Sequence, residues 1–296
     1  MTMDQKHKIR FILNPFSGVR RNIDLKALIN EHIDLSLIEL EIVFTESAGH
    51  ARILSKEAAD NDYYAVIAAG GDGTINEVAS SLIHTKTALG IIPLGSGNGF
   101  AYHTGIRRDI IKAIKLLNDA YKISIDTGSL NDQFFINVAG LGLDAKVAFL
   151  TKKNKKRGFF PYFVATMKES IHFQYMKLTI TTAEKEETGD YAMIAVANGS
   201  MYGYDFSIAP DAKMNDGLFD VVLIRKAPIF RYFGTAVLMF LKSLHKSGVV
   251  QIIRCSDVKI KTEDAGYYHL DGEGFVAACD TFVFKVNPSS LYLLTK

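Results

Sequence analysis

The chain contains no tryptophan, only two cysteines and only six prolines among its 296 residues. Cys255 and Cys279 share neither a CxxC nor a metal-like spacing, so we expect no disulfide framework and no cysteine-based zinc site. No charged segment followed by an apolar run opens the sequence, which, with the few cysteines, predicts a cytoplasmic location. The longest uncharged apolar stretch of interest, Tyr232–Leu241, is far shorter than the ~20 residues of a membrane-spanning helix. Any contact with a membrane is therefore expected to be peripheral.

The chain also lacks an excess of either charge. Its 34 lysines and arginines against 32 aspartates and glutamates give a net charge of +2, which argues against an electrostatic nucleic-acid binder. With 48% hydrophobic and 22% charged residues it has the composition of a globular protein, and its length suits two domains. A zinc site is not expected, because no i, i+4 pair or HExxH pattern occurs among the scattered His50, His103, His172 and His269.

Short β-rich runs alternate with helical patterns in the first third of the chain. Runs without polar alternation, such as Ala65–Ala69, are typical of parallel strands covered on both faces. The repeated β-then-α units predict an open, parallel, three-layer α/β domain. The expected strands are Ile9–Leu13, Glu41–Thr45, Ala65–Ala69 and Leu89–Leu94. The expected helices are Asp24–Asp34, a helix that Ser47 caps and that ends near Asp60, Ile75–His84 and Asp109–Asn118.

After about Asp126, alternating β runs separated by turn signals predict a second, mainly antiparallel β domain. Two helices interrupt it, and the apolar residues of Ile229–Leu241 nearly encircle the helix axis, which predicts burial rather than membrane anchoring. The expected strands are Phe134–Val138, Lys177–Thr182, Tyr191–Ala197, Phe219–Ile224, Val250–Cys255, Val258–Lys261, Thr281–Val286 and Ser290–Thr295, and the expected helices are Phe160–His172 and Ile229–Leu244.

Gly70–Thr74 (GGDGT) is the strongest chemical signal, since it directly follows a buried strand and directly precedes a helix. Glycines at such a place let the backbone approach a phosphate, and the helix N-terminus favours anions. Asp72 would face a polyphosphate, which requires a divalent cation or a substrate hydroxyl between them. A tight turn with a capping aspartate would also explain this loop taken alone.

Two further loops of glycine, serine and asparagine follow neighbouring predicted strands. They are Asn14–Gly18 (NPFSG) and Pro93–Gly99 (PLGSGNG). Because parallel strands end at one edge of a sheet, the three loops are expected to line one polar crevice. Neither a Walker A sequence, a GxGxxG after a strand, nor the protein-kinase signature set occurs, which argues against those nucleotide-binding classes.

Four motifs in this order resemble the diacylglycerol and sphingosine lipid kinase family: NPFSG, GGDGTINE, PLGSGNGFA and, near the end, LDGEG. Thr45 with Gly49–Ala51 and residues 196–222 are similar to that family's pattern as well. The resemblance implies phosphoryl transfer from ATP to a lipid hydroxyl. It also implies an α/β nucleotide domain (1–126, joined by 287–296) and a β-sandwich lipid domain (127–286), with the active site in the cleft between them.

The resemblance further implies roles for individual residues. Glu273 would be the catalytic base, with Asp271 as second choice and Asp72 as the third catalytic residue. A structural magnesium site would use the Asp216 carboxylate with the backbone carbonyls of Lys213 and Leu218. Contacts to ATP and its Mg²⁺ would come from Asn14, Pro15, Phe16, Ser17, Gly18, Thr45, Gly70, Gly71, Asp72, Gly73, Thr74, Asn76, Glu77, Gly95, Ser96, Gly97 and Asn98.

The lipid acceptor stays open at this point. The loop after Leu94 reads Gly-Ser-Gly-Asn-Gly, which is closer to sphingosine kinases than to the Gly-Thr-x-Asn-Asp of bacterial diacylglycerol kinases. Diacylglycerol, a sphingoid base, a monoacylglycerol or phosphatidylglycerol would each offer a hydroxyl. Two other functions also remain: an NAD kinase, which shares a GGDGT loop, and a catalytically silent sensor of nucleotide or lipid.

Lys152–Arg157 is a basic run that leads into the aromatic segment Gly158–Phe163. This composition is typical of a segment that docks on anionic lipid headgroups and inserts rings at the membrane surface. We therefore expect peripheral membrane association through this segment. An exposed edge strand in the β domain would allow a homodimer.

Overall fold

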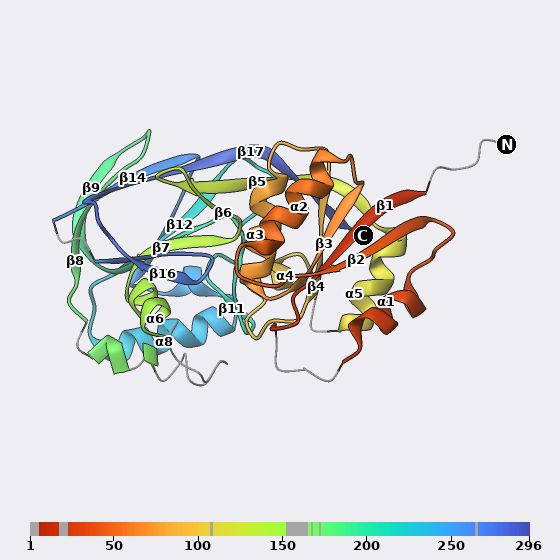
Figure 1. The fold of residues 1–296 in the computed structure, drawn as a ribbon. Coiled ribbons are helices and arrows are strands. Elements are labelled where there is room, and N and C mark those ends of the chain that lie inside the picture. The colour runs from red at the N-terminus through yellow and green to blue at the C-terminus, as the bar shows by residue number, and fades with distance from the viewer. Residues whose placement is uncertain are drawn as a thin grey trace. The chain divides into compact units, whose positions relative to one another are not determined.

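The computed structural model describes residues 6–17, 23–106, 109–151, 165–166, 168–171, 173–263 and 266–296. The chain forms two compact units, Met1–Ile125 with Ser289–Lys296, and Asp126–Pro288; their elements can be followed in Figure 1. Two long strands, β5 (Tyr121–Leu130) and β17 (Thr281–Thr295), contribute residues to both units. The predictions for Gly18 and for the basic and aromatic segments between 152 and 163 concern residues outside those described.

The first unit contains a parallel sheet in the order β17–β4–β3–β1–β2. Every residue of β3 and β4 is buried, as expected for strands covered on both faces. At its C-terminal end β17 pairs parallel with β4, Tyr292 opposite Ala88, which assigns the last strand to this sheet. The strand bounds are β1 His7–Leu13, β2 Ile38–Phe44, β3 Ala65–Gly70 and β4 Ala88–Pro93.

Helices cover both faces of this sheet, which confirms the three-layer prediction (Figure 1). Phe11 of β1 belongs to a buried cluster with Ile29 and Ile114, whereas the next residue toward the N-terminus, Arg10, bonds to the helix on the opposite face. Because side chains alternate along a strand, these contacts define the two faces. The helices are α1 Leu25–His32, α2 His50–Asp60, α3 Asp72–Leu82, α4 Gly99–His103, α5 Ile110–Leu116 and the 3₁₀ turn Leu117–Asp119.

Capping explains where these helices begin. Asp24 accepts a hydrogen bond from the Ala27 N–H at 3.0 Å, and Asp109 accepts one from the Lys112 N–H at 2.9 Å. The predicted cap of α2 by Ser47 is wrong: Gly49 holds that position with a φ of +83°, which glycine adopts without strain.

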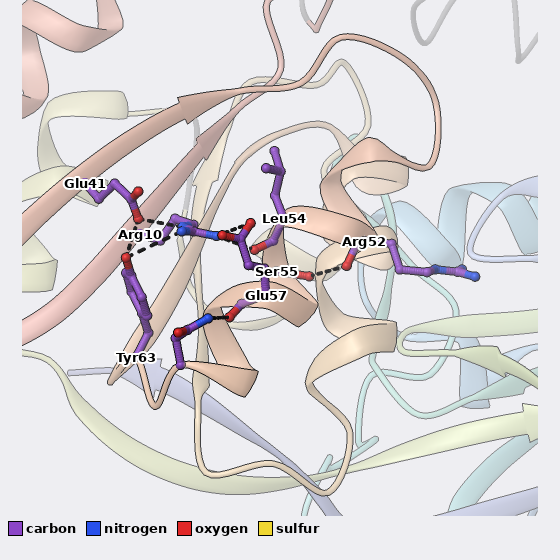
Figure 2. Close-up of polar contacts among 8 residues, drawn as sticks. Arg10, Glu41, Arg52, Leu54, Ser55, Glu57 and Tyr63 are labelled. Carbon is purple, nitrogen blue, oxygen red and sulfur yellow. Dashed lines mark hydrogen bonds and ion pairs between the residues drawn. The ribbon is translucent and has the colours of Figure 1, made fainter.

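A buried arginine connects β1 with β2 and α2, as Figure 2 shows. Arg10 Nε donates to Glu41 Oε2 at 2.6 Å and Nη1 donates to the Leu54 carbonyl at 2.9 Å, while Glu57 Oε2 lies 3.2 Å from Nη1. The Tyr63 hydroxyl donates to the same Glu41 oxygen at 2.5 Å. Burial alone would lower the pKa of Arg10, but the hydrogen bonds to Glu41 and Glu57 outweigh it and raise the pKa. The charge therefore persists inside the unit because it is paired.

The second unit is a sandwich of two antiparallel sheets. The first sheet has the order β13–β12–β9–β7–β15–β16. The second has the order β9–β8–β14–β17, with β5 and then β6 after β17. Strand β9 appears in both because its two halves belong to different sheets. Between them lies a core built around Phe135, Phe219 and Phe284. The strands are β6 Gln133–Phe135, β7 Val138–Gly142, β8 Met176–Thr181, β9 Glu186–Ala197, β12 Phe219–Arg225, β13 Val250–Cys255, β14 Asp257–Thr262, β15 Tyr267–Leu270 and β16 Glu273–Val276, with the short pair β10 Met201–Gly203 and β11 Phe206–Ser207.

Helix α8 (Ile229–Phe240) covers the outer face of the first of these sheets. Tyr232 and Met239 pack on the apolar cluster there, and Thr235 is the buried residue of the helix. The prediction that this helix is buried all round is wrong, because a row of large apolar side chains on its other side is exposed. The remaining helices are α6 Leu143–Thr151 and the 3₁₀ turn Leu244–Lys246. Within the described part of the chain, no helix has the length and hydropathy needed to cross a membrane.

Candidate active site

The strand order of the first unit creates a natural ligand site. The chain runs from β1 outward to β2 and then returns to the other side of β1 for β3 and β4. In open parallel sheets, ligands bind beyond the carboxyl ends of the strands at the point where the strand order reverses. Here that point lies between β1 and β3, and the loops Asn14–Ser17 and Gly70–Gly73 follow these two strands.

Hydrogen bonds join these loops at the sheet edge. The Asn14 side chain donates through Nδ2 to Thr74 Oγ1 at 3.0 Å, and its Oδ1 accepts the Phe16 N–H at 2.9 Å. The Asn14 N–H also donates to the Ala69 carbonyl at 3.0 Å. The first loop is thereby held against the start of α3.

The second glycine loop packs directly on the first. The Asn98 N–H donates to Asp72 Oδ2 at 2.9 Å, and Asn98 Nδ2 donates to the Gly95 carbonyl at 2.8 Å. A Cβ added to Gly95 would lie 2.7 Å from the Cα of Gly71, so this approach requires glycine. Asp72 therefore connects the two loops.

Gly73 is different, because a Cβ there would meet nothing within 4 Å, and its φ does not lie in the left-handed region. The protein itself thus has no need of glycine at this position. Gly73 stands in the first turn of α3, whose N-cap residue Gly71 offers no side-chain cap. Open space beside an uncapped helix N-terminus suits an anionic ligand such as a phosphate.

A third loop contacts the same helix. Thr45 is buried after β2 and its N–H donates to the Leu13 carbonyl at 2.9 Å, while Gly49 donates its N–H to Glu77 Oε1 at 2.9 Å. At the end of α4, burial lowers the pKa of His103 to about 4, so this side chain is neutral at physiological pH. The described candidates for nucleotide binding thus lie at the carboxyl ends of the strands, in the loops that follow them and in the first two turns of α3.

The second unit holds the other predicted carboxylates on a tight turn between β15 and β16. Asp271, with a φ of +49°, accepts three backbone hydrogen bonds, from Ile136 at 3.0 Å, Asn137 at 2.8 Å and Val138 at 3.2 Å. Glu273 is exposed at the start of β16. Asp271 is therefore built into the turn, whereas Glu273 extends from it.

A buried network that the sequence did not point to supports this turn. Asp144 Oδ2 accepts the Tyr202 hydroxyl at 2.6 Å and lies 3.0 Å from His269 Nε2. The Gly272 N–H points to His269 Nδ1 at 3.4 Å, so Nδ1 is the acceptor and Nε2 carries the proton that Asp144 accepts. Asp144 and His269 are 125 residues apart, which explains why spacing rules on histidine pairs missed them.

This geometry makes His269 a positioning residue for the turn, and two substitutions separate its two hydrogen bonds. In His269→Asn the amide oxygen can replace Nδ1 as acceptor for Gly272, whereas in His269→Gln the amide nitrogen can replace Nε2 as donor to Asp144. We expect His269→Gln to lower kcat about tenfold with the KM for ATP unchanged, because loss of positioning slows the chemical step. We expect His269→Asn to keep most of kcat, because it keeps the acceptor for the Gly272 N–H. Equal losses of kcat in the two variants, measured by steady-state kinetics, would argue that the histidine only stabilises the fold.

The loop 213–218, the predicted magnesium site, is rich in oxygen atoms, but its carboxylate already pairs with the guanidinium of Arg254. Asp216 Oδ2 pairs with Arg254 Nη2 and Oδ1 accepts the Leu218 N–H at 3.2 Å. Burial raises the pKa of the neighbouring Asp220, and Arg254, 3.4 Å away, counters this. Carboxylate and carbonyl oxygens fit Mg²⁺ in kind, but the ion would have to compete with Arg254 for the Asp216 carboxylate. Among the described residues, no group of three or more histidine, cysteine or acidic side chains is arranged to hold a metal.

Arg254→Met is therefore expected to increase the affinity of this loop for Mg²⁺ by up to about fivefold, since it removes a competing half-exposed ion pair. The measurement is the shift of the thermal midpoint during a Mg²⁺ titration without nucleotide. Arg225→Met, a change of the same type on β12, is the control. If the Mg²⁺ concentration that gives half of this thermal shift were the same in Arg254→Met as in the wild type, the loop would not bind the ion.

The fold and the first unit's loops together define a class: two-domain kinases that join an α/β nucleotide unit to a β-sandwich. Comparisons with known proteins agree. The model of the diacylglycerol kinase catalytic domain matches residues 8–130, and the model of the YegS C-terminal NAD kinase beta sandwich-like domain matches residues 137–295. A solved structure from Bacillus anthracis str. Sterne shares the fold with a TM-score of 0.80 at 23% identity, covering 98% of this chain and 97% of that one.

Curated relatives give the family. A diacylglycerol kinase of Bacillus subtilis is 32% identical over 90% of this chain and 89% of its own length. A diacylglycerol kinase of Staphylococcus carnosus is 30% identical over 75% of this chain and 74% of its own length. The chain belongs to the diacylglycerol kinase family and is an ATP-dependent lipid kinase. The resemblance stated from the sequence motifs is thereby confirmed.

Proposed function

We propose that the acceptor is the primary hydroxyl of diacylglycerol, and that the chain uses Mg²⁺-ATP to convert it to phosphatidic acid. The observation that carries the proposal is the close packing of the two glycine loops beside the open space at Gly73. This arrangement presents backbone N–H groups and one carboxylate to a polyphosphate. The names of the Bacillus subtilis and Staphylococcus carnosus relatives support diacylglycerol over a sphingoid base.

In this mechanism the first unit binds the nucleotide. Asn14 and Asn98 fix the loops, and the N-terminus of α3 faces the phosphates. Asp72 would hold the magnesium ion, which supplies neutralisation of the charge that develops on the transferred phosphoryl group. Because Asp72 also accepts the Asn98 N–H, its position is set before the nucleotide arrives.

The second unit supplies the base. Glu273 takes the proton of the lipid hydroxyl as the oxygen bonds to the γ-phosphorus and the bond to the ADP oxygen breaks. Asp271 is the weaker candidate, because three backbone N–H groups already bind its carboxylate. It keeps in place the turn from which the exposed Glu273 extends. Since the acceptor is a membrane lipid, the protein works in peripheral contact with a membrane.

The test is transfer of labelled γ-phosphate from Mg²⁺-ATP to a panel of acceptors in mixed micelles. The panel holds diacylglycerol, sphingosine, monoacylglycerol, phosphatidylglycerol and soluble NAD, with a lipid-free blank. We expect label in phosphatidic acid and none with Asp72→Asn. Label in another lipid would overturn the choice of acceptor, label only in NADP would indicate an NAD kinase, and ATP binding without any transfer would indicate a sensor.

A further inference from the structure

Helix α8 presents a continuous apolar face to solvent. Phe230 is 70% exposed, Phe233 59% and Phe240 58%, and three aliphatic side chains lie beside them. The spacing of these residues follows the helical repeat, so they share one side. They form what we call the α8 outer face: Ile229, Phe230, Phe233, Val237, Phe240 and Leu241. A contiguous exposed apolar face often marks a contact surface.

The opposite side of the helix is fixed firmly to the sandwich. The Tyr232 hydroxyl accepts the Ala227 N–H at 2.8 Å and donates to the Arg225 carbonyl at 3.1 Å. Thr235 Oγ1 and Ser247 Oγ lie 2.9 Å apart. The α8 outer face therefore cannot turn inward without breaking these bonds.

The segment of the chain that carries this face has charges of one sign. Between Asp220 and Asp257 the sequence contains no aspartate or glutamate. It contains the basic residues Arg225, Lys226, Arg231, Lys242, Lys246 and Arg254. Lys226 lies 3.8 Å from Asp190, and Arg254 pairs with Asp216 and Asp220, so these two charges are partly neutralised. The exposed Arg231, Lys242 and Lys246, on the helix and just after it, give the α8 outer face a positive rim.

Apolar rings inside a positive rim fit an anionic lipid bilayer, whose headgroups attract the cations while the rings enter the acyl boundary. A second copy of the chain fits less well. In a symmetric dimer the same surface meets itself, so the positive rims would be brought together. Charge complementarity thus favours the bilayer.

We propose that the α8 outer face docks on the surface of an anionic bilayer, with Phe230, Phe233 and Phe240 inserted at the level of the headgroups. The proposal builds on the lipid kinase function, because a diacylglycerol acceptor resides in a bilayer. It differs from the sequence-based expectation, which gave this role to Lys152–Arg157 and treated α8 as a buried helix.

The test is flotation of the full chain with vesicles of phosphatidylcholine containing phosphatidylglycerol, in the absence of ATP. Phe230→Glu combined with Phe233→Glu is expected to lower the vesicle-bound fraction at least about tenfold, since two apolar anchors become anions. Ile53→Glu on α2, where the side chain is 66% exposed, is the matched control and should bind as the wild type does. Kinase activity on a short-chain, water-dispersed diacylglycerol is measured in parallel and should be unchanged in both variants.

Each outcome is informative. Vesicle binding by the double variant at the wild-type level would overturn the proposal, as would absence of wild-type binding. A shift from dimer to monomer in size-exclusion chromatography, with vesicle binding retained, would assign the face to a second copy instead. Failure of the short-chain assay in the wild type would contradict the diacylglycerol acceptor, while the flotation result would still decide the docking surface.

Discussion

Glu273→Gln is expected to lower kcat for lipid phosphorylation by about 10²–10⁴-fold, with the affinity for ATP unchanged. Glutamine keeps the size of the side chain and its exposed position on β16, but it cannot accept the hydroxyl proton. Steady-state kinetics with a water-dispersed diacylglycerol gives kcat, and equilibrium dialysis with labelled ATP gives the affinity.

Glu263→Gln provides the matched control, because Glu263 is another well-exposed glutamate of the same unit. It should leave both quantities at the wild-type values. A different result would identify Asp271 as the base: full turnover in Glu273→Gln, with loss of turnover but not of stability in Asp271→Asn. The loss of turnover in Asp271→Asn could then not be explained by the three backbone hydrogen bonds of Asp271.

Gly73→Ala is expected to weaken ATP binding by at least about 10²-fold while the protein becomes slightly more stable. A Cβ at this position meets nothing within 4 Å, and alanine in a helix is favoured over glycine by up to about 1 kcal/mol. The added methyl group would therefore act on a phosphate bound beside it and not on the fold. Equilibrium dialysis and thermal unfolding measure the two effects separately.

Alanine substitutions of two other glycines are the controls for this prediction. Gly234→Ala on α8 also enters open space, so it should raise stability by a similar amount and leave ATP binding unchanged. Gly95→Ala should lower stability, because its Cβ would lie 2.7 Å from the Gly71 Cα. ATP binding by Gly73→Ala at the wild-type affinity would show that the phosphates do not approach this backbone.

The arrangement of the glycine-rich loops could be predicted because it depends on local patterns. Buried runs such as Ala65–Ala69 identify parallel strands, and parallel strands bring their following loops to one edge. The hydrogen bonds of Asn14 to Thr74 and of Asn98 to Asp72 confirm that the three strand-end loops meet. The helix starts at Asp24 and Asp109 follow from side-chain capping, which is equally local.

Features that depend on distant partners could not be predicted. The pattern Phe134–Val138 reads as one strand, but the chain forms β6 and β7 with a break at Ile136–Asn137, where the N–H groups bind Asp271 instead of a neighbouring strand. The environment of α8 is a second case. A helix with apolar residues all round has the same sequence pattern whether protein or another apolar surface covers its second face.

The most direct test of the account is a single turnover. Excess protein with bound γ-labelled ATP is mixed with water-dispersed diacylglycerol and Mg²⁺, then quenched over time. The account predicts that label enters a chloroform-soluble phosphatidic acid in a fast phase with wild-type protein and at least about 10²-fold more slowly with Glu273→Gln. Label released only as inorganic phosphate, or equal rates for both proteins, would contradict it.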